Sequence, residues 1–138
     1  MTCFAIACLA SFAVAFLLGS IPSGVVIGRL FFGVDPRSGG SGSIGATNST
    51  RMLGAKGGAA VLVCDMLKGA VAVGIARAAI HLAGLCGMQA DTLLIGAAFF
   101  AIAGHIYSPW LGFKGGKGIS TGFGSLLVAS PVIALCIA

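Results

Sequence analysis

The chain has 138 residues, of which 58% are hydrophobic and only 8% are charged. A water-soluble domain carries roughly 25% charged residues, so this composition excludes a soluble globule and predicts an all-α integral membrane protein, a single polytopic domain over residues 1–138. The net charge of +5 is scattered along the chain, which argues against nucleic-acid binding and fits the basic excess on the cytoplasmic side of membrane proteins.

The first 28 residues contain no charged side chain, which exceeds the ~20 that a spanning helix needs. A secretory signal peptide would begin with a positively charged region, so we expect a retained transmembrane helix. The sequence GSIPSG at 19–24 interrupts this apolar run. Its freed backbone groups must find partners in protein or water, so it should line a polar cavity.

Residues 35–56 form a first glycine-rich segment that is too polar to face lipid. We expect an ordered loop followed by a short helical piece carrying Arg51. Ser41, Thr47, Asn48 and Arg51 are donors with no adjacent carboxylate, and a guanidinium binds phosphate bidentately. Helix capping accounts for one or two of these residues but not for all of them, which favours phosphate binding.

The second predicted span, 59–80, carries two charged residues inside apolar sequence. Asp65 and Lys68 are three residues apart and share a helix face. Each costs about 2.5–3.5 kcal/mol to insert, and pairing offsets part of that cost. Two interpretations stay open: Lys68 reaches an anion site while Asp65 holds it, or the pair ties helices together inside the membrane.

The third predicted span begins at Thr92 and leads through His105 into a second glycine-rich loop, 110–118. His105 either carries a proton or binds phosphate, or satisfies backbone carbonyls, which is the commoner role. In the run Lys114-Gly115-Gly116-Lys117-Gly118, consecutive glycines can turn N–H groups toward one anion ahead of a helix N-terminus. A flexible basic turn on anionic lipid is the alternative, and this loop alone does not decide.

A fourth span is predicted over 119–138, kinked at Pro131. Basic residues gather on one side of the predicted spans, so the positive-inside rule places both glycine-rich loops in the cytoplasm and the N-terminus outside.

The five cysteines form no CxxC pair, and we expect neither a metal nor a cofactor. No Ser-His-Asp or Cys-His signature is visible, so an enzyme of this sequence would depend on positioning and charge stabilisation.

Two other classes compete with an enzyme. A transporter for a phosphorylated solute also uses broken helices at anion sites, but usually near the midplane and with paired repeats, which this sequence does not show. A purely structural membrane subunit would leave the clustered donors unexplained.

Taken together and in order, these motifs resemble one family. GSIPSG at 19–24, GSGSIGATN at 40–48 with Arg51, DMLKG at 65–69, Gly104-His105 and FKGGKG at 113–118 are similar to the bacterial acyl-phosphate:glycerol-3-phosphate acyltransferases, the PlsY family. The resemblance implies an inner-membrane protein, usually of seven spans. It also implies transfer of an acyl group from acyl phosphate to the 1-hydroxyl of glycerol 3-phosphate, giving lysophosphatidic acid and phosphate without a cofactor.

The resemblance also implies residue roles. Ser41 and Arg51 match the first family motif, and Gly115, Gly116 and Lys117 match the phosphate-binding loop of the second. We therefore expect Ser41, Arg51 and Lys117 to be catalytic. The expected ligands of substrate phosphate are Gly42, Thr47, Asn48, Lys68, His105, Lys114, Gly115 and Gly116.

Two features depart from the family pattern. Ser43 stands where the family usually has asparagine, and the histidine and asparagine of a third, C-terminal motif are not matched. We expect the chain to be a piece of about two-thirds of a family member, which puts activity of these residues alone in question.

Overall fold

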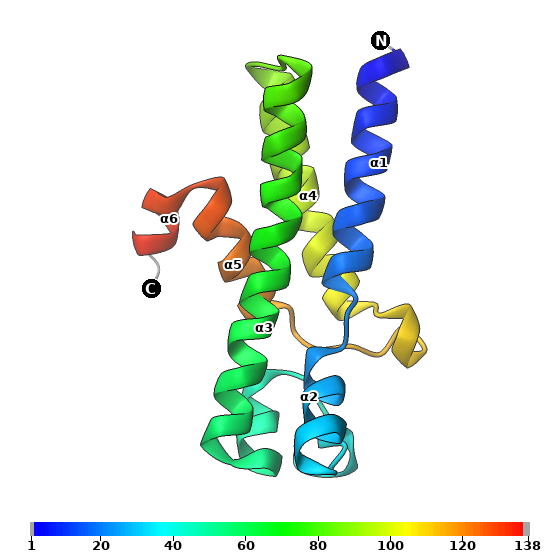
Figure 1. The fold of residues 1–138 in the computed structure, drawn as a ribbon, viewed down its shortest axis with the longest axis vertical. Coiled ribbons are helices and arrows are strands. Elements are labelled where there is room, and N and C mark those ends of the chain that lie inside the picture. The colour runs from blue at the N-terminus through cyan, green and yellow to red at the C-terminus, as the bar shows by residue number, and fades with distance from the viewer. Residues whose placement is uncertain (1, 137–138) are drawn as a thin grey trace.

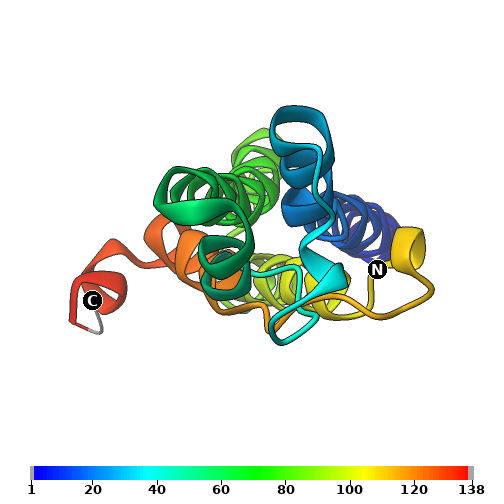
Figure 2. The same ribbon diagram turned by 90° about the horizontal axis from the view of Figure 1, so that it is seen from below.

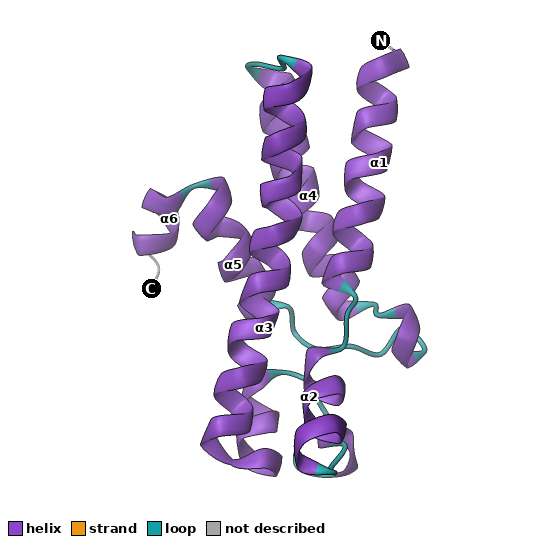
Figure 3. Ribbon diagram, viewed as in Figure 1, coloured by secondary structure: helices purple, strands orange, loops and turns teal. Residues whose placement is uncertain are grey.

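The computed structural model describes residues 2–136, and every regular element in that range is helical, as predicted (Figures 1 and 3). Three stretches are long and apolar enough to cross a membrane: Phe4–Phe32, Ala46–Ala83 and Met88–Leu111. The α-helices are α1 (Thr2–Gly19), α2 (Ser23–Phe32), α3 (Ala46–Ala83), α4 (Met88–Ile106), α5 (Ile119–Ala129) and α6 (Pro131–Cys136). Two short 3₁₀ turns, η1 (Pro36–Ser38) and η2 (Pro109–Leu111), lie in the connections.

The long helices α1, α3 and α4 stand side by side around a core of small side chains. Five buried alanines form this core: Ala15, Ala72, Ala76, Ala97 and Ala101. A Cβ on Gly19 would overlap the backbone of Ala101, and one on Gly104 would overlap the Phe16 carbonyl oxygen. Small residues therefore let the α1 and α4 backbones approach closely, as is usual for helices that pack within a membrane.

The break between α1 and α2 is stabilised by side chains from distant segments. Ser108 Oγ donates to the Ser20 carbonyl at 2.7 Å, and Trp110 Nε1 donates to Ser20 Oγ at 2.9 Å. Lys68 Nζ donates to the Ile21 carbonyl at 2.7 Å. The predicted polar partners of this break are therefore present, and they are donor side chains of the protein. Residues 19–24 do not line the cavity described below.

Helix α3 contains a sharp reversal at Gly54, whose φ of 78° and ψ of 176° are not helical. A Cβ on Gly58 would overlap the Thr50 side chain, a contact that a straight helix forbids because it places residues eight apart about 12 Å from each other. The first two turns therefore fold back on the long part of the helix. This reversal creates the predicted short helical piece that carries Arg51.

The predicted fourth span, 119–138, is interrupted. Helix α5 ends at Ala129, and Pro131 begins α6 after a single non-helical residue, Ser130. Proline lacks an N–H, and the residue before it disfavours helical geometry. Viewed along the bundle, α6 stands to one side of it (Figure 2). Residues 137 and 138 lie outside the described part of the chain.

Candidate active site

A cavity of about 360 Å³ opens where the two glycine-rich segments meet the middle of α3. Five segments contribute polar groups to its lining: Ser41, Ser43, Thr47, Asn48 and Arg51 from the first glycine-rich segment, Asp65 from the long part of α3, His105 from α4, Lys117 from the second glycine-rich loop and Ser120 from the first turn of α5. The fold thus brings residues that are far apart in sequence around one space.

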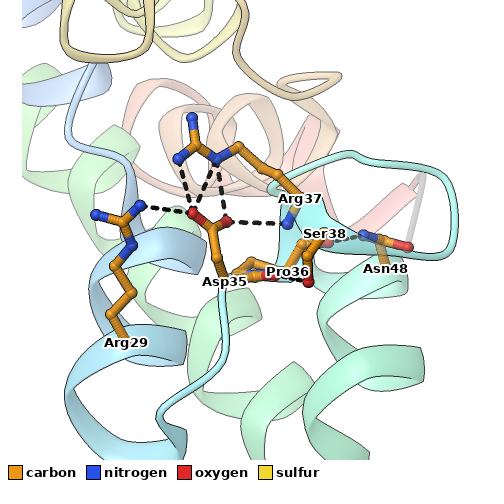
Figure 4. A network of polar contacts seen from close by, with 6 residues as sticks. All are labelled: Arg29, Asp35, Pro36, Arg37, Ser38 and Asn48. Atoms are coloured by element: carbon orange, nitrogen blue, oxygen red, sulfur yellow. Dashed lines mark hydrogen bonds and ion pairs between the residues drawn. The ribbon is translucent and has the colours of Figure 1, made fainter.

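The first glycine-rich segment is organised around Asn48, which is 2% exposed. Its Nδ2 donates to the carbonyls of Pro36 (2.7 Å) and Ser43 (2.9 Å), with a longer bond to Gly39 (3.3 Å). Its Oδ1 accepts the Ser41 N–H at 2.8 Å. Figure 4 shows the amide reaching back toward η1. The loop backbone thus uses both the donor and the acceptor of this amide. Asn48 borders the cavity, but its role is to hold the loop in place.

The basic residues near the first segment differ in their partners (Figure 4). Asp35 lies 2.7 Å from Arg37 Nη2 and 2.8 Å from Arg29 Nη2. The hydrogen bonds from Arg37, followed by that from Arg29, hold the pKa of the Asp35 carboxyl well below its usual range. Among residues 2–136, by contrast, neither Arg51 nor Lys117 lies within ion-pair distance of a carboxylate. These two cations are therefore available to an anion in the cavity.

The second glycine-rich loop is docked on the end of α4. The Gly115 N–H donates to the Ile106 carbonyl at 2.9 Å, and the Gly116 N–H donates to the His105 carbonyl at 3.1 Å. A Cβ on either glycine would overlap His105. Both N–H groups are thus hydrogen-bonded within the protein. The absence of a side chain at the two glycines lets the loop approach His105 closely. Lys117, the next residue, is exposed and lines the cavity.

A buried charged cluster lies below the cavity. Lys68 Nζ is 2.9 Å from Asp65 Oδ1, and both side chains are almost inaccessible. His105 Nδ1 is 3.6 Å from the same oxygen and 3.3 Å from Thr121 Oγ1. Lys68 does not line the cavity, and its ammonium donates to the Ile21 carbonyl. The interpretation of Asp65 and Lys68 as a pair that ties helices together therefore fits the geometry better.

Six of the eleven predicted site residues line the cavity: Ser41, Thr47, Asn48, Arg51, His105 and Lys117. The other five, Gly42, Lys68, Lys114, Gly115 and Gly116, do not. Three polar residues line it without having been predicted as site residues: Ser43, Asp65 and Ser120. The sequence offered a signal for Asp65, because a carboxylate inside an apolar span is unusual. It offered no signal for Ser120. Within residues 2–136, no group of three or more His, Cys, Asp or Glu side chains is placed to hold a metal ion.

The sequence and the fold both match known proteins. Residues 9–138 match the family model described as glycerol-3-phosphate acyltransferase. A protein of that name from an Anaeromyxobacter species is 50% identical over 123 residues, which is 89% of this chain and 59% of the relative. The Thermus thermophilus protein of the same name is 47% identical over 121 residues, 88% of this chain and 56% of the relative.

Two solved structures share the fold. The crystal structure of PlsY, an integral membrane glycerol 3-phosphate acyltransferase, in its glycerol 3-phosphate form is 41% identical with a TM-score of 0.78. Its lysophosphatidic acid form is 38% identical with a TM-score of 0.74. Each alignment covers 94% of this chain and 60% of the other, so the chain spans about three-fifths of the proteins it matches. The chain belongs to the glycerol-3-phosphate acyltransferase family of integral membrane proteins.

Proposed function

We propose that the full-length protein transfers an acyl group from acyl phosphate to the 1-hydroxyl of glycerol 3-phosphate, giving lysophosphatidic acid and inorganic phosphate. The observation that carries this proposal is the convergence of Ser41, Arg51 and Lys117 on one cavity, where the two cations have no carboxylate partner among residues 2–136. Crystal forms of a relative named for glycerol 3-phosphate and lysophosphatidic acid support the same substrate and product.

The chemistry needs charge stabilisation more than an enzyme nucleophile. The hydroxyl oxygen of glycerol 3-phosphate attacks the acyl carbonyl carbon and forms the ester bond. The bond between that carbon and the phosphate oxygen breaks, and phosphate leaves with the electron pair. The hydroxyl proton passes to a phosphate oxygen of a substrate. Arg51 and Lys117 hold phosphate groups and stabilise the charge that develops on the departing one, while the Ser41 hydroxyl donates a hydrogen bond.

The ligand set around these three residues is narrower than the sequence suggests. Thr47 lines the cavity beside Arg51 and adds a hydroxyl donor. Gly42 and Lys114 contribute through the shape and charge of their loops. The buried ammonium of Lys68 acts at a distance, because its hydrogen bond goes to Ile21.

We infer that this site faces the cytoplasm in a bacterial inner membrane, with the N-terminus outside. Six basic residues lie on the side of the glycine-rich segments: Arg29, Arg37, Arg51, Lys56, Lys114 and Lys117. The opposite side carries only Arg77 and His81 against Asp91. This asymmetry is the positive-inside pattern.

Substitution of the two free cations tests the proposal. In the full-length protein in detergent, we measure phosphate release from acyl phosphate in the presence of glycerol 3-phosphate. Lys117→Ala and Arg51→Ala should each lower kcat/KM by about 10²–10³, the usual cost of removing one stabilising donor. Lys56→Ala removes an exposed lysine that does not line the cavity and should change kcat/KM by less than about twofold.

The outcomes separate the candidate functions. Unchanged kinetics in Lys117→Ala would remove the second loop from the site. A protein that binds glycerol 3-phosphate but releases no phosphate from acyl phosphate would act as a transporter or a structural subunit instead.

A further inference from the structure

The side chain of His105 is packed tightly against protein groups from three segments of the chain. The residue is 3% exposed although it lines the cavity. Its Nδ1 lies 3.3 Å from Thr121 Oγ1 and 3.6 Å from Asp65 Oδ1. Its Nε2 faces the α-carbon of Gly116, where an added Cβ would overlap it.

The same residue holds the phosphate loop through its main chain. The His105 carbonyl accepts the Gly116 N–H at 3.1 Å, and the next carbonyl, of Ile106, accepts the Gly115 N–H at 2.9 Å. The ring and the carbonyl of His105 therefore support the two glycines directly before Lys117. A shift of the imidazole would displace the turn that places Lys117 at the cavity.

Two elements, α3 and α5, hold the imidazole in turn. Asp65 comes from α3, and Thr121 comes from the first turn of α5 and is fully buried. Asp65 is itself held at 2.9 Å by Lys68, whose ammonium bonds the break between α1 and α2 at Ile21. The cluster links the helix break, the middle of α3 and the start of α5 to a single ring.

We propose that His105, held by Thr121 and Asp65, is a positioning residue that sets Lys117 opposite Arg51. The proposal rests on the function proposed above, because it assigns the buried cluster a task only if Lys117 binds phosphate. It also gives Asp65 a role, although this residue matches none of the phosphate-binding positions expected from the sequence.

Thr121→Val is the sharpest test, because it keeps the shape of the side chain and removes only the hydroxyl. Binding of glycerol 3-phosphate to the full-length protein without acyl donor is measured by calorimetry. Thr121→Val should weaken binding about three- to tenfold, the range expected for the loss of one hydrogen bond. Thr121→Ser, which keeps the hydroxyl, should restore it.

The decisive measurement repeats Thr121→Val in the Lys117→Ala background. If the cluster acts through Lys117, the added loss in that background should be less than about 1.5-fold, because coupled sites are not additive. Ser125→Ala, at another fully buried hydroxyl of α5 that bonds the Thr121 carbonyl and not the imidazole, is the matched control and should change binding by less than about twofold.

Each outcome decides between explanations. Unchanged binding in Thr121→Val, or an equal loss with and without Lys117, overturns the positioning role. If Lys117→Ala itself binds as tightly as the native protein, the proposed function fails instead. A second variant, Asp65→Asn with Lys68→Met, removes both buried charges together, so it leaves no unpaired ammonium. In this double variant too, the loss of glycerol 3-phosphate binding should be smaller in the Lys117→Ala background than in the native background.

Discussion

Two arginines of the first glycine-rich segment, Arg37 and Arg51, have different roles. Arg37 is bound by Asp35, while Arg51 faces the cavity without a carboxylate partner among the described residues. The sequence already separates them, because Asp35 stands two residues before Arg37 and no carboxylate lies near Arg51. Pairing with Asp35 neutralises one cation and, by anchoring η1, stabilises the loop that presents Ser41.

Asn48 is the residue on which that loop depends, and Asn48→Ala tests it. The substitution removes the donors to Pro36, Gly39 and Ser43 and the acceptor of the Ser41 N–H. Leaving buried backbone groups unpaired costs about 1–3 kcal/mol each. We expect the KM for glycerol 3-phosphate to rise at least about tenfold in a steady-state assay, because Ser41 moves out of position.

Ser38→Ala is the control for Asn48→Ala. It deletes one exposed hydrogen bond of the same loop, from Ser38 Oγ to the Asp35 carbonyl, and should leave KM within about twofold. Equal effects of the two substitutions would show that Asn48 has no special part in shaping the site.

The predicted spans are interrupted at three places, and the first two interruptions are tied to residues of the site or of the cluster beside it. The break after Gly19 gives a carbonyl to Lys68, the reversal at Gly54 turns Arg51 back toward the long part of α3, and the stop before Pro131 ends α5. Irregular backbone at membrane depth needs partners within the protein. Buried side chains supply them at the first break, which is why the α1–α2 junction is rich in long-range hydrogen bonds.

The crossing of α3 and α5 places Thr121 against the buried cluster, and glycine makes this crossing possible. A Cβ on Gly124 would overlap the Met66 carbonyl oxygen, whereas one on Gly74 would meet nothing within 4 Å. Gly124→Ala should therefore destabilise the protein by about 1–3 kcal/mol. Gly74→Ala should be neutral or stabilise it by up to about 1 kcal/mol through helix propensity.

Thermal unfolding in detergent measures both glycine variants. A lower midpoint for Gly124→Ala beside an unchanged or higher one for Gly74→Ala is the expected pair. Identical midpoints would mean that the α3–α5 contact tolerates a methyl group and does not fix the position of Thr121.

At the scale of the whole molecule, both glycine-rich segments lie away from the turn that joins α3 and α4 (Figure 1). That turn carries the exposed native Cys86, which makes the orientation measurable. In right-side-out vesicles, with the other cysteines replaced by alanine, a membrane-impermeant maleimide should label Cys86 directly. Lys56→Cys and Lys114→Cys, in proteins that also lack Cys86, should react only after permeabilisation. If those two variants react from opposite sides, a shared site is impossible.

The membrane fold and the family could be read from the sequence because they depend on local properties. Composition and the lengths of the apolar runs determine which segments can enter lipid, and the comparisons confirm an integral membrane family. The short helical piece carrying Arg51 was also predicted, since polar residues before an apolar span cannot continue into lipid. The motifs named six of the residues that line the cavity, together with five residues that do not.

Only the tertiary structure decided what individual polar groups do. Asn48, Gly115 and Gly116 look like phosphate donors in the sequence, yet their N–H groups are occupied by carbonyls from elsewhere in the chain. A hydrogen bond forms with whichever group arrives within about 3 Å, and the packing of distant helices determines which group that is. The sequence alone determined that cations and glycines would gather in this protein. The packing of α3, α4 and α5 decided that, within the described part of the chain, Arg51 and Lys117 have no carboxylate partner.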